Sequence, residues 1–227
     1  MPTASPRTAL AKTPPRSRKS SEERRDQILR EAARCFGTRG FRGTTTRDVA
    51  AAVGITEAAL YRHFPGKEAI YAAILDARMA VPEVIAALAP AARERDDRRV
   101  FTELASAIFG AVEADPSFLR LLLYSALEGH EMARPFYETR MRRLREFLTR
   151  YVARRMRDGA FRPGDPALAA RAFMGMVADH LIARTVFGQR EQDAHSSAAI
   201  AETFTDIFLD GVRAPSPRRT NGATSRG

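Results

Sequence analysis

Two pairs of an acid and a histidine are the only candidates for catalytic chemistry in this sequence: Glu128 with His130, and Asp179 with His180. The sequence contains no Ser/His/Asp or Cys/His grouping, no glycine-rich phosphate loop and no His-Glu-x-x-His metal motif. The single cysteine, Cys35, excludes an internal disulfide framework and a zinc site with several cysteines, and it fits a reducing cytoplasm. We therefore expect a cytoplasmic protein that is not an enzyme and that needs no cofactor or metal.

The net charge of +10 is concentrated at the two ends of the 227-residue chain. Residues 1–20 contain five basic residues and no acidic one, and residues 211–227 contain four and none, so the body between them is nearly neutral. Both ends are rich in Pro, Ser, Thr, Arg and Gly and have no apolar period, which predicts disordered tails. The charge permits binding to nucleic acid but does not establish it.

Helical periodicity runs through the rest of the chain, and strand alternation is absent. Capping residues, glycines and prolines divide this part into about nine helices, and Pro82 is expected to break or kink the chain. No apolar run approaches the ~20 residues that span a bilayer, so no membrane partner is expected. The expected helices are 20–39, 46–53, 57–64, 67–79, 96–114, 116–127, 133–157, 166–187 and 196–210.

The segment from Thr44 to Lys67, TTTRDVAAAVGITEAALYRHFPGK, has the pattern of two helices that cross near a right angle. Ala50 supplies the small side chain that the crossing needs, and Gly54, four residues later, tolerates the positive φ of a tight turn. This is the pattern of a helix-turn-helix, in which the second helix reads the major groove of DNA. Apolar residues occupy its inner positions: Val49, Val53, Ile55 and Leu60.

The context of this pattern, from Ile28 to Tyr71, resembles the N-terminal domain of the TetR family of transcriptional regulators. The matching motifs are GTRGFRGTTTRDVA, ALYRHF and PGKEAIY, in the family's order and spacing. The resemblance implies a sequence-specific DNA-binding regulator, usually a repressor, whose C-terminal bundle binds a small molecule and forms a homodimer. It also implies that the effector releases the protein from a palindromic operator. The sequence itself does not distinguish repression from activation.

The resemblance places the residues that contact double-stranded DNA at the start of the first motif helix and along the second. Lys67, the only lysine outside the tails, is expected to meet a phosphate. Glu57 stands where the family often has a small or basic residue. A carboxylate there repels phosphates, yet it accepts a hydrogen bond from a cytosine amino group. The implied contact residues are Thr45, Thr46, Arg47, Thr56, Glu57, Ala58, Tyr61, His63 and Lys67.

The expected fold is therefore all-α, with a three-helix helix-turn-helix domain followed by a larger helical bundle. We divide the chain into a disordered basic tail (1–20), the helix-turn-helix domain (21–66), a connecting helix (67–81), a ligand-binding and dimerisation domain (82–212) and a second disordered tail (213–227).

Inward-facing residues of the bundle either line a cavity for a small hydrophobic or amphipathic effector or fill the core. Polar side chains at the boundary, such as Tyr124 and His180, are candidate anchors for the effector. The candidates for the cavity wall are Phe101, Leu104, Ile108, Phe118, Leu122, Tyr124, Tyr137, Met141, Phe173, Met176 and His180.

The last two helices, 166–187 and 196–210, have apolar residues on more than one face and lie near the end of the chain. Two such hairpins facing each other make a four-helix interface with two-fold symmetry, so we expect the homodimer to form there. The candidate interface residues are Phe173, Val177, Leu181, Ile200, Phe204, Ile207 and Phe208.

A competing hypothesis is an architectural DNA-binding protein that works through its basic tails. In that case DNA binding survives deletion of residues 44–64 and is lost with the tails. In the leading hypothesis residues 1–20 either add affinity by following phosphates or only aid solubility.

Overall fold

The structure, a computed structural model, describes residues 20–78, 81–128, 138, 141–189 and 195–214. Most of the two predicted tails (1–19 and 215–227), Met79, Tyr137 and most of the predicted helix between 133 and 141 lie outside these ranges. The helices of the described residues are α1 (Ser21–Arg39), α2 (Thr46–Val53), α3 (Glu57–Tyr61), α4 (Lys67–Arg78), α5 (Val81–Glu94), α6 (Asp97–Ala114), α7 (Pro116–Leu127), α9 (Arg142–Arg157), α10 (Pro166–Thr185) and α11 (Ser197–Val212).

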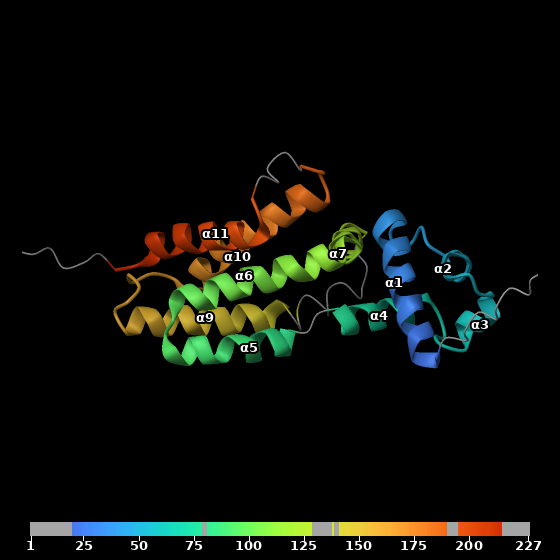
Figure 1. Cartoon of the computed structure of the whole chain (residues 1–227), viewed down its shortest axis with the longest axis horizontal. Coiled ribbons are helices and arrows are strands. Elements are labelled where there is room, and N and C mark those ends of the chain that lie inside the picture. Colours follow the sequence, from blue (N-terminus) through green and yellow to red (C-terminus); the bar gives the residue numbers. More distant parts are fainter. Residues whose placement is uncertain (1–19, 79–80, 129–137, 139–140, 190–194, 215–227) are drawn as a thin grey trace, which may run out of the picture.

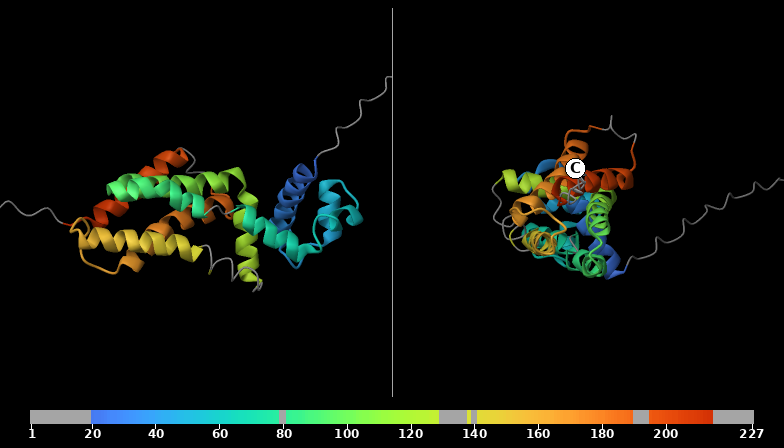
Figure 2. Two further views of the ribbon diagram at one scale, coloured as in Figure 1. Left: turned by 90° about the horizontal axis from the view of Figure 1, so that it is seen from below. Right: turned by 90° about the vertical axis from the view of Figure 1, so that its left-hand side faces the viewer.

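The all-α prediction is confirmed for the described residues, whose one β contact is an isolated antiparallel bridge between Phe161 and Arg213. The molecule is elongated (Figure 1). Helices α1 to α4 form an N-terminal unit at one end, and α5, α6, α9, α10 and α11 form a bundle at the other. Helix α7 crosses the end of the bundle that faces the N-terminal unit (Figure 2, left).

Several helix ends lie where the sequence predicts them because a polar side chain satisfies the first backbone N–H groups. Ser20 and Glu23 form the predicted capping box of α1. Asp165 caps α10, with Pro166 at its first position, where the missing N–H has no intrahelical partner to lose.

Two parts of the predicted helix pattern differ from the structure. Pro82 lies in the first turn of a further helix, α5, where proline is tolerated, and residues 79–80, between α4 and α5, lie outside the described residues. Helix α5 was not predicted from the sequence, and it also contains Pro90 in its interior. Helix α3 ends at Tyr61 and does not continue to Phe64. The N–H of Phe64 still bonds to the Leu60 carbonyl at 3.1 Å, so the chain completes one more turn outside the helix.

The described residues have two hydrophobic cores, one in the N-terminal unit and one in the bundle. Helix α4, predicted as a connecting helix, contributes four buried residues to the first core: Ile70, Tyr71, Ile74 and Leu75. The first core also contains Phe118 and Leu121, which belong to α7. The second core is centred on Phe101, which packs at 4.8 Å from the ring of Phe173 and at 4.6 Å from the ring of Phe208.

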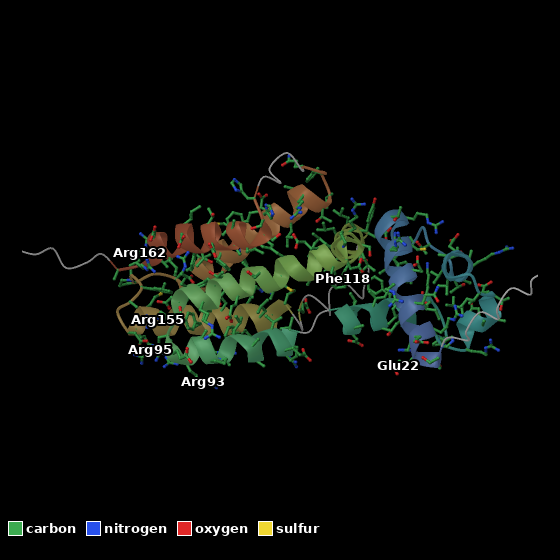
Figure 3. All side chains as sticks on the ribbon, viewed as in Figure 1. Glu22, Arg93, Arg95, Phe118, Arg155 and Arg162 are labelled. Carbon is green, nitrogen blue, oxygen red and sulfur yellow. The ribbon has the colours of Figure 1, made fainter. Side chains whose placement is uncertain are left out.

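A charged network closes the bundle at the end farthest from the N-terminal unit, where Figure 3 shows Arg155 and Arg95. Arg155 donates to both carboxylate oxygens of Asp97, at 2.7 and 3.0 Å, and to Asp158 at 3.1 Å. The Tyr151 hydroxyl donates to Asp97 at 2.6 Å. Burial and this hydrogen bond raise the pKa of Tyr151. The network joins the start of α6 to α9.

Candidate nucleic-acid interface

Helix α2 begins at a capping box made by Thr45 and Asp48. The Thr45 side chain accepts from the N–H of Asp48 at 3.2 Å, and the Asp48 carboxylate accepts from the N–H of Thr45 at 2.8 Å and from its hydroxyl at 2.6 Å. The bonds from Thr45 hold the pKa of Asp48 below its ordinary value, and the Arg39 guanidinium at 3.2 Å acts in the same direction. Thr45 therefore has a structural role, and its contact with DNA stays a prediction.

The turn between α2 and α3 has the geometry that the sequence predicts. Gly54 has φ 75° and ψ 38°, a left-handed conformation that residues with a Cβ rarely adopt. Ala50 is 2% exposed and Leu60 is fully buried, and both belong to the first core. Thr56 caps α3 by accepting from the N–H of Ala59 at 3.2 Å. The helix-turn-helix prediction is confirmed.

Three of the predicted contact residues meet on one surface of this motif. Thr46 Oγ1 donates to Glu57 Oε1 at 2.5 Å and lies 3.4 Å from the Tyr61 hydroxyl. Tyr61 is 49% exposed, and the next residues in sequence after Thr46 and Glu57, Arg47 and Ala58, are exposed as well. The motif thus presents a connected polar surface built from both helices, in which Thr46 orients the carboxylate of Glu57.

His63 follows α3 and is half-buried. Its carbonyl accepts from Arg25 Nη1 at 3.4 Å, and the Arg25 guanidinium lies 4.3 Å from the centre of the Phe64 ring. Arg25 was not among the predicted residues of this surface. It lies on α1, 38 residues before His63, so no local spacing in the sequence relates the two.

The ammonium group of Lys67 faces the chain segment that leads into α2. It donates to the carbonyl oxygens of Phe41 and Thr44, at 3.1 and 3.2 Å, and lies 4.4 Å from the centre of the Phe41 ring. Two of its three N–H donors are therefore engaged within the N-terminal unit. Its contact with a phosphate stays a prediction, and a role in holding the segment Gly40–Thr44 is added. We call this segment the linking turn.

A cavity of about 270 Å³ lies in the bundle beside α7, between α5, α6, α9 and α10. Ile108, Phe118, Leu122 and Met141, all predicted wall residues, line it. Every described residue that lines it is apolar, so none of them supplies the polar anchor expected from the sequence. The described lining residues are Val81, Val84, Ala107, Ile108, Ala111, Val112, Phe118, Leu119, Leu122, Met141, Leu144, Met174, Val177, Ala178, Leu181 and Ile182.

The other predicted wall residues do not line this cavity. Phe101, Leu104 and Phe173 are fully buried in the bundle core, and Met176 packs against that core. Tyr124 is 42% exposed. The His180 ring packs at 5.3 Å from Phe109 and at 5.9 Å from Phe204. Tyr137 lies outside the described residues.

The predicted dimer residues divide into some that are buried in the core and others that are partly or largely exposed. Four of them fill the core of the single chain and so cannot form its outer surface: Phe173, Val177, Leu181 and Phe208, each at most 5% exposed. Ile200 and Phe204 are half-buried, and Ile207 is 59% exposed. Apolar periodicity alone does not distinguish a face that packs within the chain from one that packs against a partner. Leu168 on α10, which was not among the predicted interface residues, is 61% exposed.

Within the described residues, no group of three or more His, Cys, Asp or Glu side chains is placed to hold a metal ion. No helix among them is both long enough and apolar enough to cross a bilayer.

Comparison with known proteins places both parts of the chain in one family. Residues 28–74 match the family described as bacterial regulatory proteins, tetR family, and residues 99–211 match the C-terminal domain of the AefR-like transcriptional repressors. The HTH-type transcriptional repressor KstR2 of Rhodococcus jostii (strain RHA1) is 29% identical over 213 residues, which cover 89% of this chain and 98% of the repressor.

Solved structures have the same fold. The TetR family transcriptional regulator PfmR from Thermus thermophilus has a TM-score of 0.65 at 27% identity, covering 81% of this chain and 97% of PfmR. AibR, crystallised with isovaleryl coenzyme A and operator DNA, has a TM-score of 0.60 at 24% identity, covering 82% of this chain and 97% of AibR. With both its helix-turn-helix region and its C-terminal region matched, the chain belongs to the TetR family of bacterial regulatory proteins.

Proposed function

We propose that this protein is a cytoplasmic, non-enzymatic transcriptional repressor that α2 and α3 hold on an inverted-repeat operator until a small apolar effector releases it. The observation that supports DNA reading most directly is the polar surface shared by both motif helices. Helix α3 buries Leu60 and leaves Tyr61 exposed, while Thr46 orients the Glu57 carboxylate. A helix-turn-helix inserts this side of its second helix into the major groove.

The homodimer of this proposal forms through the outer faces of α10 and α11. Leu168 and Ile207 are exposed there, and the small residues Ala172, Gly175 and Gly211 are exposed on the same two helices. Small residues allow two helices to approach closely. Two-fold symmetry then implies two half-sites about one helical turn apart, roughly 34–36 Å, or a multiple of that spacing.

The effector of this proposal contains a hydrocarbon group that enters the cavity. The volume of about 270 Å³ exceeds the roughly 150 Å³ of an apolar cavity that admits benzene, and the wall residues that the structure describes are all apolar. AibR was crystallised with isovaleryl coenzyme A, which has a short branched acyl group. Each buried methylene contributes about 0.8 kcal/mol, so affinity should rise roughly fourfold per added methylene until the cavity is full.

A footprint on the DNA beside the protein's own gene tests both parts. We expect protection of an inverted repeat, and loss of protection when acyl coenzyme A thioesters are added, with isovaleryl coenzyme A and its longer saturated homologues as probes. Free coenzyme A is the matched control and should not release the DNA. Absence of a protected repeat contradicts the DNA-reading role. Release that does not depend on the length of the acyl chain contradicts the role of the cavity.

A further inference from the structure

Helix α7 lies between the cavity and the N-terminal unit, and its side chains contribute to the wall of the first and to the core of the second. Phe118 is part of the first core and also lines the cavity, and Leu122 packs against that core and lines the cavity as well. Figure 3 shows Phe118 at the end of the bundle that faces α1. A molecule that enters the cavity therefore meets a wall whose other side packs in the N-terminal unit.

The backbones of α1 and α7 touch where α7 begins. A Cβ atom at Gly37 of α1 would lie 2.7 Å from the carbonyl oxygen of Ser117, a distance that real Cβ atoms do not show. Backbone atoms cannot rotate out of the way as a side chain can. A displacement of α7 is therefore transmitted to α1 instead of being absorbed by a change of rotamer.

The other end of α7 contacts the linking turn through Glu128, the C-cap residue of the helix. The Glu128 carboxylate oxygen Oε2 accepts from the backbone N–H of Phe41 at 3.1 Å and from that of Arg42 at 3.4 Å. Gly40 leaves the space for it, because a Cβ atom there would collide with Glu128 Oε1. From the sequence, Glu128 was considered as a partner of His130 in catalysis and as a polar group at the boundary of the effector pocket. Its role at the linking turn was not predicted, because its contacts are more than 80 residues away.

The linking turn is thus bound on two sides by groups of opposite charge. Glu128 binds its N–H groups from α7, and Lys67 binds the carbonyl oxygens of Phe41 and Thr44 from α4. Thr45, the N-cap of α2, follows the turn directly. The position of the first motif helix therefore depends on where the two charged groups hold the turn.

We propose that Glu128 is a positioning residue for DNA recognition: it holds the linking turn in the DNA-binding arrangement, and displacement of α7 by an occupied cavity withdraws it. This proposal rests on the proposed function. A hydrogen bond to a charged group is strong enough to favour one position of the turn, and it weakens steeply when its geometry is lost. The cavity and the DNA-binding motif are then two distinct sites, and both of them act on the position of the linking turn.

The test fills the cavity with a larger side chain introduced by substitution, so that no effector has to be identified. Val177→Phe on α10 and Ile108→Phe on α6 place an aromatic ring into two different walls, so failure of one variant to fold leaves the other. In the parent chain each should weaken operator binding about tenfold, within the roughly 5–150-fold range of allosteric coupling. In a Glu128→Ala background the same substitution should change the dissociation constant less than about twofold.

Asp206→Asn is the matched control. Like Glu128, Asp206 is a carboxylate that joins two parts of the chain, since it binds Arg98 of α6 from α11, but it lies away from the linking turn. In the Asp206→Asn background, a substitution that fills the cavity should still weaken operator binding about tenfold. An equal effect of filling in the parent and Glu128→Ala backgrounds overturns the proposal.

Hydrogen exchange separates this proposal from the proposed function, because it needs no DNA. Filling the cavity of the free protein should accelerate amide exchange at Phe41 and Arg42 by about tenfold or more. Unchanged exchange there overturns the role of Glu128. Accelerated exchange with unchanged operator binding shows that the cavity acts on the linking turn, but it overturns the role of Glu128 in DNA recognition.

Discussion

Replacing Lys67 by methionine tests whether this residue holds the linking turn or contacts DNA. The ammonium donates to two carbonyl oxygens and lies over the Phe41 ring. Hydrogen bonds to a charged group contribute about 1.5–3 kcal/mol each when buried, and a cation–π contact at an exposed site about 0.5–1 kcal/mol. Because Lys67 is half-buried and methionine keeps its aliphatic stem, we expect the free energy of unfolding to fall by about 2–4 kcal/mol.

Thermal unfolding followed by circular dichroism measures this loss. For a chain of this size, 1 kcal/mol corresponds to a shift of roughly 2–4 °C, so the melting temperature of Lys67→Met should fall by roughly 5–15 °C. The second measurement is operator binding at several salt concentrations, at a temperature where both proteins are folded. Each neutralised phosphate contributes about −0.9 to the slope of log Kobs against log salt. If Lys67 acts only by holding the linking turn, that slope is unchanged.

Arg47→Met is the control for the same motif. Arg47 is exposed at the start of α2, so its loss should leave stability within about 0.5 kcal/mol and reduce the magnitude of the salt slope by about one. The reasoning is refuted if Lys67→Met keeps its melting temperature and loses one phosphate contact, since Lys67 then acts on DNA as the sequence alone suggested.

Three further predictions concern other parts of the molecule. Arg155→Met leaves the nearly buried carboxylate of Asp97 without its cation and should cost about 3–5 kcal/mol in chemical denaturation, with the salt slope of DNA binding unchanged. Ile207→Glu places a charge on the proposed dimer face and should give a monomer in sedimentation; a stable dimer contradicts that interface. Glu57→Gln should move the preference at one base pair of each half-site from C·G toward A·T by about 1–3 kcal/mol in a binding selection. Thr46→Val should weaken that preference without changing which base pair is preferred. An equal loss of affinity for all DNA sequences would show that the hydrogen bond between Thr46 and Glu57 only stabilises the motif.

The features that were predicted correctly from the sequence depend on residues close to one another in the chain. Gly54 adopts the positive φ that its spacing from Ala50 demands, and Thr45 and Thr56 cap the helices that follow them. A cap or a tight turn is determined within about four residues, so the sequence alone displays it. The same local reasoning missed α5, because a proline that interrupts one helix is also tolerated in the first turn of the next one.

The features that were missed depend on which surfaces meet. Phe173 and Ile207 are both apolar residues on the last two helices, yet one is fully buried in the core and the other is 59% exposed. The hydrophobic effect has no direction, so an apolar face does not specify what covers it. The polar contacts of Glu128 and Lys67 with the linking turn were not predicted either. Their partners are backbone groups of the linking turn, which every residue type supplies, so no side chain in the sequence marks the contact.

Helix α7 also connects the N-terminal unit to the proposed dimer helices. The Arg120 guanidinium donates twice to the carbonyl oxygen of Thr185, at 2.7 and 3.1 Å, and so binds α7 to the last residue of α10. The motif lies at the far end of an elongated molecule, beyond α7 (Figure 1). A small rotation at α7 therefore produces a larger displacement at α3 than at the cavity. Because two motifs of a dimer must match half-sites at a fixed spacing, a change at α7 that leaves each motif intact is sufficient to lose the operator.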